Sequence, residues 1–170
     1  MQVREVDVAI IGAGTAGMTA YRIAREHTDN LLVIESSHYG TTCARVGCMP
    51  SKLLIAAAEV NHQIGEAGKF GIDVSSSTVD GARVMARVKA ERDRFVGFVE
   101  EAVDDWPAEH KLWGKAKFVR PHEFMVDGGV RVIANRIVIA AGTTPAISTP
   151  WSSVRHMPPT YHQLFALYSL

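Results

Sequence analysis

Two cysteines, Cys43 and Cys48, are the side chains of this sequence best suited to redox chemistry. They are the only cysteines among 170 residues, and four residues separate them. The run 53–58 after them is rich in leucine and alanine, which favour helix, and Pro50 is tolerated in a first helical turn. The pair is therefore expected at the start of a helix, where the helix dipole favours a thiolate over a thiol.

The spacing of the two cysteines restricts how they could be joined. In one regular helix their Cα atoms would be about 8 to 9 Å apart, whereas a disulfide needs less than about 7 Å. If they form a disulfide, Cys43 must lie outside the regular helix, and Gly47 provides the backbone freedom for that. These residues alone leave four interpretations open: two unrelated buried thiols, half of a zinc site, a structural disulfide, or a redox-active dithiol. The sequence offers no second cysteine pair for zinc.

A glycine-rich turn near the N-terminus predicts a second kind of site. Residues 12–17 read GAGTAG, follow the apolar run 6–11, and precede an apolar helical stripe. Another apolar run, 31–34, ends at Glu35. This order is typical of a βαβ unit, with the start of its helix facing phosphate groups.

Each residue type in this unit has a physical reason. Gly12 permits the tight turn, Gly14 lets the backbone approach a pyrophosphate, and Gly17 lets the helix pack closely on the strand. Glu35, at the end of the second strand, is placed to accept hydrogen bonds from a ribose. The unit predicts dinucleotide binding but does not choose between FAD and a nicotinamide nucleotide.

The rest of the chain shows further elements. The helix after the cysteines is expected to continue to about residue 68, and a polar linker at 75–78 leads to a long helix at 80–106 with Asp80 as its N-cap. Strands are expected at 112–119 and 136–140, with a hairpin of strands 123–126 and 130–133 between them. Gly114 weakens the strand at 112–119. The apolar face of the long helix fits either packing within the chain or contact with a partner.

Composition excludes several classes of function. Eighteen basic and eighteen acidic residues cancel, which argues against binding to nucleic acid or to an anionic membrane surface. Apolar runs are too short to span a membrane, and Glu5 and Asp7 make the N-terminus unlike a signal peptide. The seven histidines have no metal-binding spacing. With two cysteines, a reducing cytoplasmic location is expected, and no metal site.

Together these motifs resemble the FAD half of the pyridine nucleotide-disulfide oxidoreductases, and most of all the dihydrolipoamide dehydrogenases in that family. The resemblance covers roughly residues 6–150, and the stretch 43–52 is its most specific part. It implies a Rossmann-like α/β fold with a parallel sheet, long helices and a β-hairpin or β-meander insertion. Residues 1–150 would form the FAD-binding domain with its redox disulfide. Residues 151–170 would be an exit segment toward a nicotinamide domain absent from this chain.

At a few positions this sequence differs from the commonest family pattern or matches some enzymes of the family better than others. Thr41 stands where the commonest version has glycine, and Ala141 stands where the family has threonine. Ser51 before Lys52 is more similar to dihydrolipoamide dehydrogenases and mercuric reductases than to glutathione reductases.

The resemblance also implies roles for individual residues. Cys43 would be the thiol that exchanges with substrate sulfur, and Cys48 the thiol beside the flavin that forms a charge-transfer contact. Lys52 would lie near flavin N5 and favour the anionic reduced ring. The cofactor-binding residues expected from the glycine motif and the resemblance are Gly12, Gly14, Thr15, Ala16, Gly17, Glu35, Ser36, Gly40, Thr41, Thr42, Lys52, Ala116, Ala141 and Gly142.

The function implied is that of an FAD-dependent dithiol/disulfide oxidoreductase. A small dithiol or disulfide would react at Cys43, and electrons would pass through Cys48 and FAD to NAD bound by a domain absent from this chain. The full-length family member would be a homodimer. The chain alone is expected to have no sustained disulfide reductase activity, because it holds one βαβ fingerprint and no matching acid-base histidine. The alternatives are a non-catalytic FAD- or nucleotide-binding fragment, or an enzyme related to mercuric or glutathione reductases.

Overall fold

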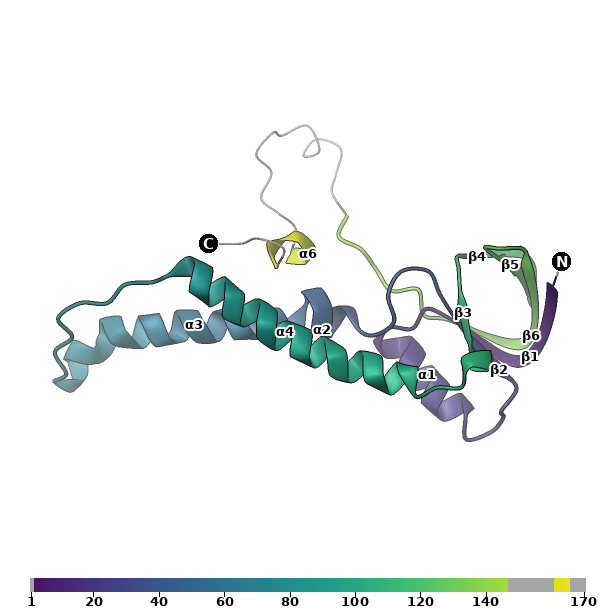
Figure 1. The fold of residues 1–170 in the computed structure, drawn as a ribbon, viewed down its shortest axis with the longest axis horizontal. Coiled ribbons are helices and arrows are strands. Elements are labelled where there is room, and N and C mark those ends of the chain that lie inside the picture. Colours follow the sequence, from purple (N-terminus) through teal and green to yellow (C-terminus); the bar gives the residue numbers. More distant parts are fainter. Residues whose placement is uncertain (1, 147–160, 166–170) are drawn as a thin grey trace, which may run out of the picture. The chain divides into compact units, whose positions relative to one another are not determined.

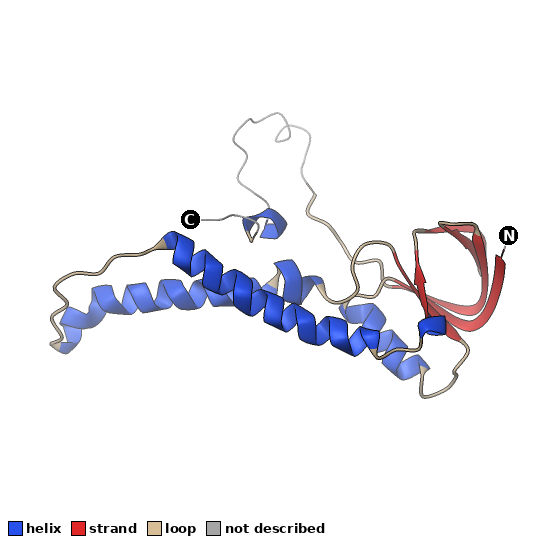
Figure 2. Ribbon diagram, viewed as in Figure 1, coloured by secondary structure: helices blue, strands red, loops and turns tan. Residues whose placement is uncertain are grey.

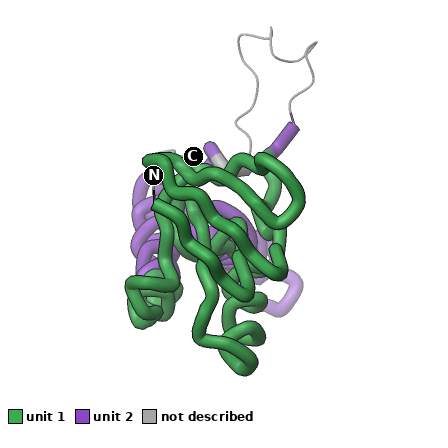
Figure 3. The backbone as a smooth tube through the Cα atoms, turned by 90° about the vertical axis from the view of Figure 1, so that its right-hand side faces the viewer, with its two compact units in different colours: residues 1–41, 98–144 green, residues 42–97, 145–170 purple. Residues whose placement is uncertain are grey.

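The computed structural model describes residues 2–146 and 161–165 of the chain. These fall into two compact units, residues 1–41 with 98–144 and residues 42–97 with 145–170 (Figure 3). The first unit holds the β-sheet, and the second is built from helices (Figures 1 and 2). The boundary expected at residue 150 lies outside the described residues and stays a prediction.

The first unit is organised around one sheet, drawn in red in Figure 2. Its strand order is β3-β2-β1-β6-β5-β4. The strands are β1 Gln2–Ile11, β2 Leu31–Glu35, β3 Lys111–Trp113, β4 Ala116–Arg120, β5 Glu123–Val126 and β6 Val130–Ile139. The pairs β3–β2, β2–β1 and β1–β6 are parallel. The pairs β6–β5 and β5–β4 are antiparallel and form a meander. The expected α/β fold with a parallel sheet and a meander is therefore confirmed.

Apolar strand residues pack on both faces of this sheet, as the continuous apolar runs predict. Leu32 and Ile34 belong to a core that includes Phe124 of the meander. Leu31 and Val33 point to the other face, where Tyr21 of helix α1, Thr15–Ala24, covers them. Helix α1 is thus the crossover between the parallel strands β1 and β2, and the βαβ unit is confirmed.

Strand β6 differs from the sequence prediction. The two strands expected at 130–133 and 136–140 are one continuous strand, Val130–Ile139. One edge of it pairs with β1 along its length, whereas β5 covers the other edge only from Val130 to Ile133. Ala134 and Asn135, which lay between the two expected strands, belong to β6 because the pairing with β1 runs through them, from Ala134 opposite Val6 to Arg136 opposite Val8. Asn135 is exposed, and its side-chain amide donates to the Asp7 carboxylate over 3.2 Å.

The single strand expected at 112–119 is in fact two, β3 and β4, separated at Gly114. Gly114 has φ +146°, in the region that glycine adopts readily, and an added Cβ would meet Val126 at 2.6 Å. The chain turns there from the β2 edge of the sheet toward the hairpin. Helix η2, Ala108–His110, precedes β3.

The second unit contains helices α2 Thr42–Val46, α3 Cys48–Glu66, η1 Ala67–Phe70 and α6 Tyr161–Leu164, and most of α4 Gly81–Asp104. Asp80 caps α4 as expected, because its carboxylate accepts the backbone N–H of Arg83 over 3.0 Å. The Arg92 guanidinium donates to the carbonyl of Phe165, just after α6, over 3.2 Å. Within the described ranges, no helix has the length and apolarity needed to cross a membrane.

Candidate cofactor cradle and dithiol

The turn between β1 and α1 uses its three glycines in two different ways. Gly12 has φ +103°, and a side chain there would collide with the carbonyl of Ala140. A side chain on Gly17 would collide with the carbonyl of Gly12. Gly14 differs, because no atom lies within 4 Å of the place a Cβ would occupy. Gly12 and Gly17 therefore serve packing, and Gly14 keeps open space in front of the start of α1.

Glu35 accepts four hydrogen bonds, and one of them ties its carboxylate to this turn. Its Oε2 accepts the backbone N–H of Ala13 over 2.8 Å. Its Oε1 accepts the backbone N–H groups of Ser36 and Ser37 over 2.8 and 2.9 Å, and the Ser37 hydroxyl over 3.1 Å. The strand β2 thus ends with a carboxylate fixed beside the glycine turn.

These bonds set the charge of Glu35. Burial raises the pKa of the carboxyl group, but the hydrogen bonds from Ala13, Ser37 and Ser36 outweigh it and hold the pKa below its ordinary value. Glu35 is therefore ionised at neutral pH and is a strong acceptor.

Ser37 is a residue of the cradle that the sequence prediction missed, although it included Ser36. Two serines directly after an acid at a strand end are a usable signal, because serine favours turns that bond nearby side chains and backbone. The loop that follows returns to the glycine turn, where the N–H of Gly40 donates to the carbonyl of Ala13 over 3.1 Å. Thr41 comes directly after Gly40 and is the last residue of this segment of the first unit.

The remaining predicted residues of the first unit, which are Ala116, Ala141 and Gly142, lie near the ends of β1 and β2 at which the glycine turn and Glu35 also lie. The N–H of Ala140 donates to the carbonyl of Ile11 over 2.7 Å, which places Ala141 beside Gly12. Gly142 follows with φ +72°. On the other side of β2, the N–H of Gly114 donates to the carbonyl of Glu35 over 2.8 Å, so Ala116 follows that strand end by two residues.

The dithiol belongs to the second unit. Cys43 lies in the short helix α2 and Cys48 is the first residue of α3, so Cys43 is outside the regular helix as the spacing required. Gly47 separates the helices, and a Cβ on it would press against the Cα of Cys43 at 3.2 Å. Both cysteines are free thiols here, Cys43 half-buried and Cys48 exposed.

The acidity of the Cys43 thiol depends mainly on its neighbour Cys48. The hydrogen bond with Cys48, followed by burial, raises the pKa of Cys43 above its usual value, although Lys52 and the backbone N–H of Cys48 act in the opposite direction. The expectation that the helix start favours the thiolate is therefore wrong for Cys43, because the partner sulfur outweighs the helix terminus.

Lys52 and Thr42 complete this segment. Lys52 is exposed and lies one helical turn after Cys48, where its positive charge lowers the pKa of Cys43. Thr42 begins α2, and its carbonyl oxygen is 3.2 Å from the place of a Cβ on Gly47. Ser51, between Cys48 and Lys52, donates its hydroxyl to the Cys48 carbonyl over 3.0 Å.

The residues of the first unit fit a dinucleotide. Gly14 is the N-cap of α1 and offers no side chain to the first backbone N–H groups of that helix, so a phosphate could accept them. Oε2 of the ionised Glu35 accepts only the N–H of Ala13, so this oxygen keeps one lone pair for a ribose hydroxyl, whereas Oε1 already accepts three hydrogen bonds. No cluster of three or more His, Cys, Asp or Glu suited to a metal ion occurs in the described part of the chain.

Comparison with known proteins places the chain in a family of redox enzymes. A family model described as pyridine nucleotide-disulphide oxidoreductase matches residues 6–160. A mercuric reductase of Shigella flexneri is 35% identical over 146 residues, covering 82% of this chain and 26% of that protein. A glutathione reductase of Burkholderia cepacia is 31% identical, covering 86% of this chain and 32% of that protein. A dihydrolipoyl dehydrogenase of Mycoplasma pneumoniae is 31% identical, covering 84% and 31%.

A solved structure shares the fold. The HOCl-induced flavoprotein disulfide reductase RclA of Escherichia coli aligns with a TM-score of 0.61 at 25% identity, covering 84% of this chain and 29% of that one. The chain thus spans about a third or less of the relatives it matches. Membership in such a family implies FAD as the cofactor of this part, with the nicotinamide nucleotide bound by other domains. From the glycine turn, the ionised acid, the paired thiols and these matches, we conclude that the chain belongs to the pyridine nucleotide-disulphide oxidoreductase family.

Proposed function

We propose that this chain is the FAD-binding and dithiol-bearing part of a flavin-dependent dithiol/disulfide oxidoreductase. The observation that carries the proposal is the placement of Cys43 in α2 and Cys48 at the start of α3, on either side of Gly47, whose backbone lies close to the Cα of Cys43. Because Cys43 lies outside the regular helix of α3, the pair does not have the Cα separation that a single helix would impose and that is too long for a disulfide. The nearby charge of Lys52 supports the thiolate that exchange chemistry requires.

The cofactor would be held by groups of the first unit. Backbone N–H groups of Thr15, Ala16 and Gly17 would bind the phosphates, Gly14 would leave room for them, and Glu35 would accept the ribose hydroxyls. Ser36, Gly40, Thr41, Thr42, Ala116, Ala141 and Gly142 are proposed as further contacts. FAD, when bound, supplies two-electron redox chemistry that protein side chains lack.

The chain's own chemical step is thiol–disulfide exchange. With the pair oxidised, a substrate thiolate attacks the Cys43 sulfur, the Cys43–Cys48 bond breaks, and Cys48 leaves as a thiolate. The second substrate thiol then displaces Cys43. The substrate has become a disulfide, and its two electrons and two protons are now on Cys43 and Cys48. Reduction of a disulfide substrate is the same sequence in reverse.

The finer assignments rest on the family resemblance. We propose a small dithiol or disulfide as substrate, with the dihydrolipoamide dehydrogenase type first, although relatives named mercuric and glutathione reductase are similarly close. NAD as final acceptor, a homodimeric full-length protein and a reducing cytoplasmic location complete the proposal.

Thiol counting tests the redox pair. The reduced chain should show two titratable thiols under denaturing conditions. Diamide, a mild thiol oxidant, should remove both without forming dimers, whereas Cys43→Ser and Cys48→Ser should each retain one thiol or dimerise through it. Two thiols that remain free in the oxidised wild-type chain would refute a redox pair.

A further inference from the structure

Trp113, the last residue of β3, is an exposed aromatic side chain that the proposed function does not use. It is 55% exposed and lies opposite Glu35 in the parallel pairing of β2 with β3. Residues paired in this way point to the same face of a sheet, on strands about 4.8 Å apart. Trp113 is therefore a direct neighbour of the residue whose carboxylate is proposed to hold the ribose of FAD.

Tyr39 packs against the ring of Trp113 and anchors it to the core of the first unit. The centroids of the two rings are 5.7 Å apart, and the ring planes are inclined by 57°, which is within the range that aromatic pairs favour. Tyr39 is partly buried and packs on the core cluster that contains Ile10 and Val33. Trp113 thus has a fixed neighbour on one side, while more than half of its surface stays accessible to a ligand.

The glycine turn, Glu35 and Trp113 stand at the ends of three neighbouring parallel strands. The strand order β3-β2-β1 puts the end of β2 between the other two. The N–H of Gly12 donates to the carbonyl of Ile34 over 2.8 Å, on the β1 side. On the β3 side, the N–H of Gly114 donates to the carbonyl of Glu35 over 2.8 Å. Hydrogen bonds therefore join the three strand ends in one row.

The order of this row matches the order of groups in the ADP half of FAD, which is phosphates, ribose and adenine. With the phosphates at the glycine turn and the ribose at Glu35, the next strand end along the row is that of β3. The backbone there is held in place, because the N–H of Lys115 donates to the Asp127 carboxylate over 2.9 Å. The adenine is therefore expected beside Trp113, on a strand end that is fixed before the ligand arrives.

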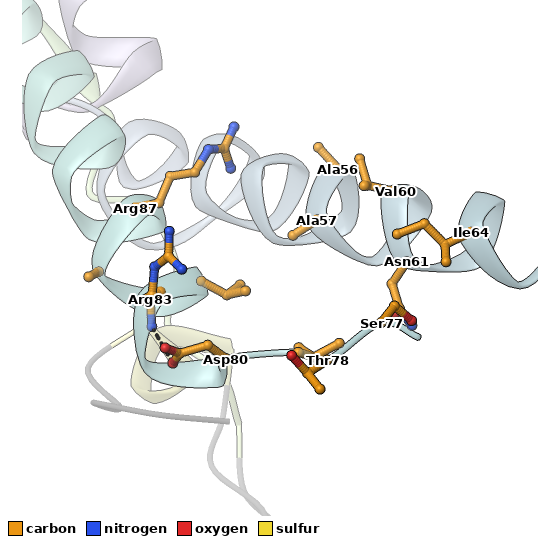
Figure 4. A pocket seen from close by; sticks show the side chains of 13 residues that line it. Ala56, Ala57, Val60, Asn61, Ile64, Ser77, Thr78, Asp80, Arg83 and Arg87 are labelled. Atoms are coloured by element: carbon orange, nitrogen blue, oxygen red, sulfur yellow. Dashed lines mark hydrogen bonds between the residues drawn. The ribbon is translucent and has the colours of Figure 1, made fainter. Parts of the chain in front are cut away.

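The adenine would lie on an open surface and not in a cavity. The cavity of about 840 Å³ in Figure 4 belongs to the second unit, where α3, the segment after it and the start of α4 line it. Two cavities of the first unit adjoin α1, and neither Glu35 nor Trp113 lines them. On an open surface an aromatic side chain is the natural contact for a base, because every base has a flat π-face that can stack on it.

We propose that Trp113 binds the adenine ring of FAD by stacking, and that Tyr39 is a positioning residue that orients the Trp113 ring. This inference rests on the proposed FAD site and adds to it the contact for the base. It implies that Trp113 acts on ligands that carry adenosine, such as FAD and ADP, and does not act on FMN, which has the flavin and one phosphate but no adenosine.

Affinities of the full chain for FAD, ADP and FMN test the proposal, with equilibrium dialysis as the measurement. Trp113→Ala should weaken FAD and ADP by a similar factor of about five- to ten-fold, in the lower part of the range for base–aromatic stacking. It should leave the affinity for FMN unchanged. Trp113→Phe keeps an aromatic ring and should recover most of the loss.

A double-mutant cycle tests the role of Tyr39. Tyr39→Leu keeps an apolar side chain in the core but removes the ring that contacts Trp113, so it should weaken FAD less than Trp113→Ala does. In the Trp113→Ala background, Tyr39→Leu should have no further effect on FAD affinity, because its influence passes through the Trp113 ring.

Phe118 provides the matched control. It is 46% exposed on β4, and its ring is 5.7 Å from that of Phe124 with an inclination of 57°, so it resembles Trp113 in exposure and in ring contact. Phe118→Ala should leave the affinities for all three ligands unchanged. Thermal unfolding without ligand shows whether each variant is folded.

Tryptophan fluorescence gives a readout that a merely structural role would not move. Binding of ADP should quench the emission of the wild-type chain, because the adenine contacts an indole ring. In Trp113→Phe this quenching should be lost although the variant still binds ADP. The comparison uses a variant that keeps an aromatic ring at the end of β3, so it decides the question even where Trp113→Ala does not fold.

Three results would overturn the inference while leaving the FAD site in place. They are unchanged FAD and ADP affinities in folded Trp113→Ala, an equal loss of FMN affinity in that variant, and full ADP quenching in Trp113→Phe. A wild-type chain that binds neither FAD nor ADP would overturn the proposed FAD site together with this inference.

Discussion

The backbone N–H of Ala13 donates to Oε2 of Glu35 over 2.8 Å, and this bond ties the glycine turn to the end of β2. The two residues are 22 positions apart, and neither strand nor helix hydrogen bonding requires them to meet. Ser36 and Ser37 hold the other carboxylate oxygen. The acid is therefore fixed before any ligand arrives, which lowers the entropic cost of binding a ribose there.

Removal of this acid should weaken FAD binding. Glu35→Ala takes away the acceptor of the ribose hydroxyls and should cost about 1.5 to 3 kcal/mol of binding free energy, as for hydrogen bonds to charged groups. Quenching of FAD fluorescence during titration with protein measures the affinity. The exposed Glu59→Ala serves as a control with the same change in composition. Equal affinities of Glu35→Ala and wild type would contradict the assignment.

Glu35 should also make the stability of the chain depend on acid pH. Its folded pKa is below the ordinary value, so its contribution is fully present above the unfolded pKa of about 4.3 and is lost as pH falls through the lower folded value. Glu35→Gln should therefore be less stable than wild type at pH 6, and the difference should shrink at pH 3. Urea midpoints at the two pH values measure this, and a difference independent of pH would exclude the carboxylate as its source.

Substitution by alanine should affect fold stability at Gly17 and FAD affinity at Gly14. Gly17→Ala places a methyl group against the Gly12 carbonyl and should destabilise the fold by about 1 to 3 kcal/mol or more. Gly14→Ala meets no protein atom, so it should keep the unfolding midpoint but weaken FAD binding by filling the space for the phosphates. Thermal unfolding with and without FAD separates the two effects. Tight FAD binding by Gly14→Ala would argue against a pyrophosphate at this turn.

The sequence predicts local features of this fold more fully than contacts between distant residues. The βαβ unit, the Asp80 cap and the hairpin follow from glycine positions, apolar runs and one capping side chain, which are all local signals. The continuity of β6 does not, because its two halves have different neighbours on one edge and the polar pair at 135–136 interrupts the apolar pattern. Ser37 and Ala13 meet at Glu35 only because the chain folds back after β2.

The raised pKa of Cys43 likewise does not follow from the local sequence. Position at a helix start argued for a low pKa, but the side-chain hydrogen bond with Cys48 depends on how Gly47 sets α2 against α3.

The influence of Cys48 on Cys43 predicts how substitutions move the pKa of Cys43. Cys48→Ala removes the main cause of the raised value, so the pKa of Cys43 should fall, and Lys52→Met should raise it by removing a cation. The measurement is the rate of alkylation of Cys43 by iodoacetamide as a function of pH, with the modified residue identified by peptide mass. In the Cys48→Ala chain the midpoint should lie at lower pH than in wild type. A midpoint that is unchanged or higher would show that Cys48 does not control it.

The most direct measurement of the redox proposal is the anaerobic reduction of bound FAD by a dithiol. The chain is saturated with FAD, oxidised at its cysteines and mixed with dihydrolipoamide, while flavin absorbance is followed. We predict rapid bleaching by two electrons per flavin in the wild-type chain and bleaching at the rate of free FAD in Cys43→Ser and Cys48→Ser. Rates in the wild-type chain that equal those of the two serine variants would contradict a dithiol that passes electrons to FAD.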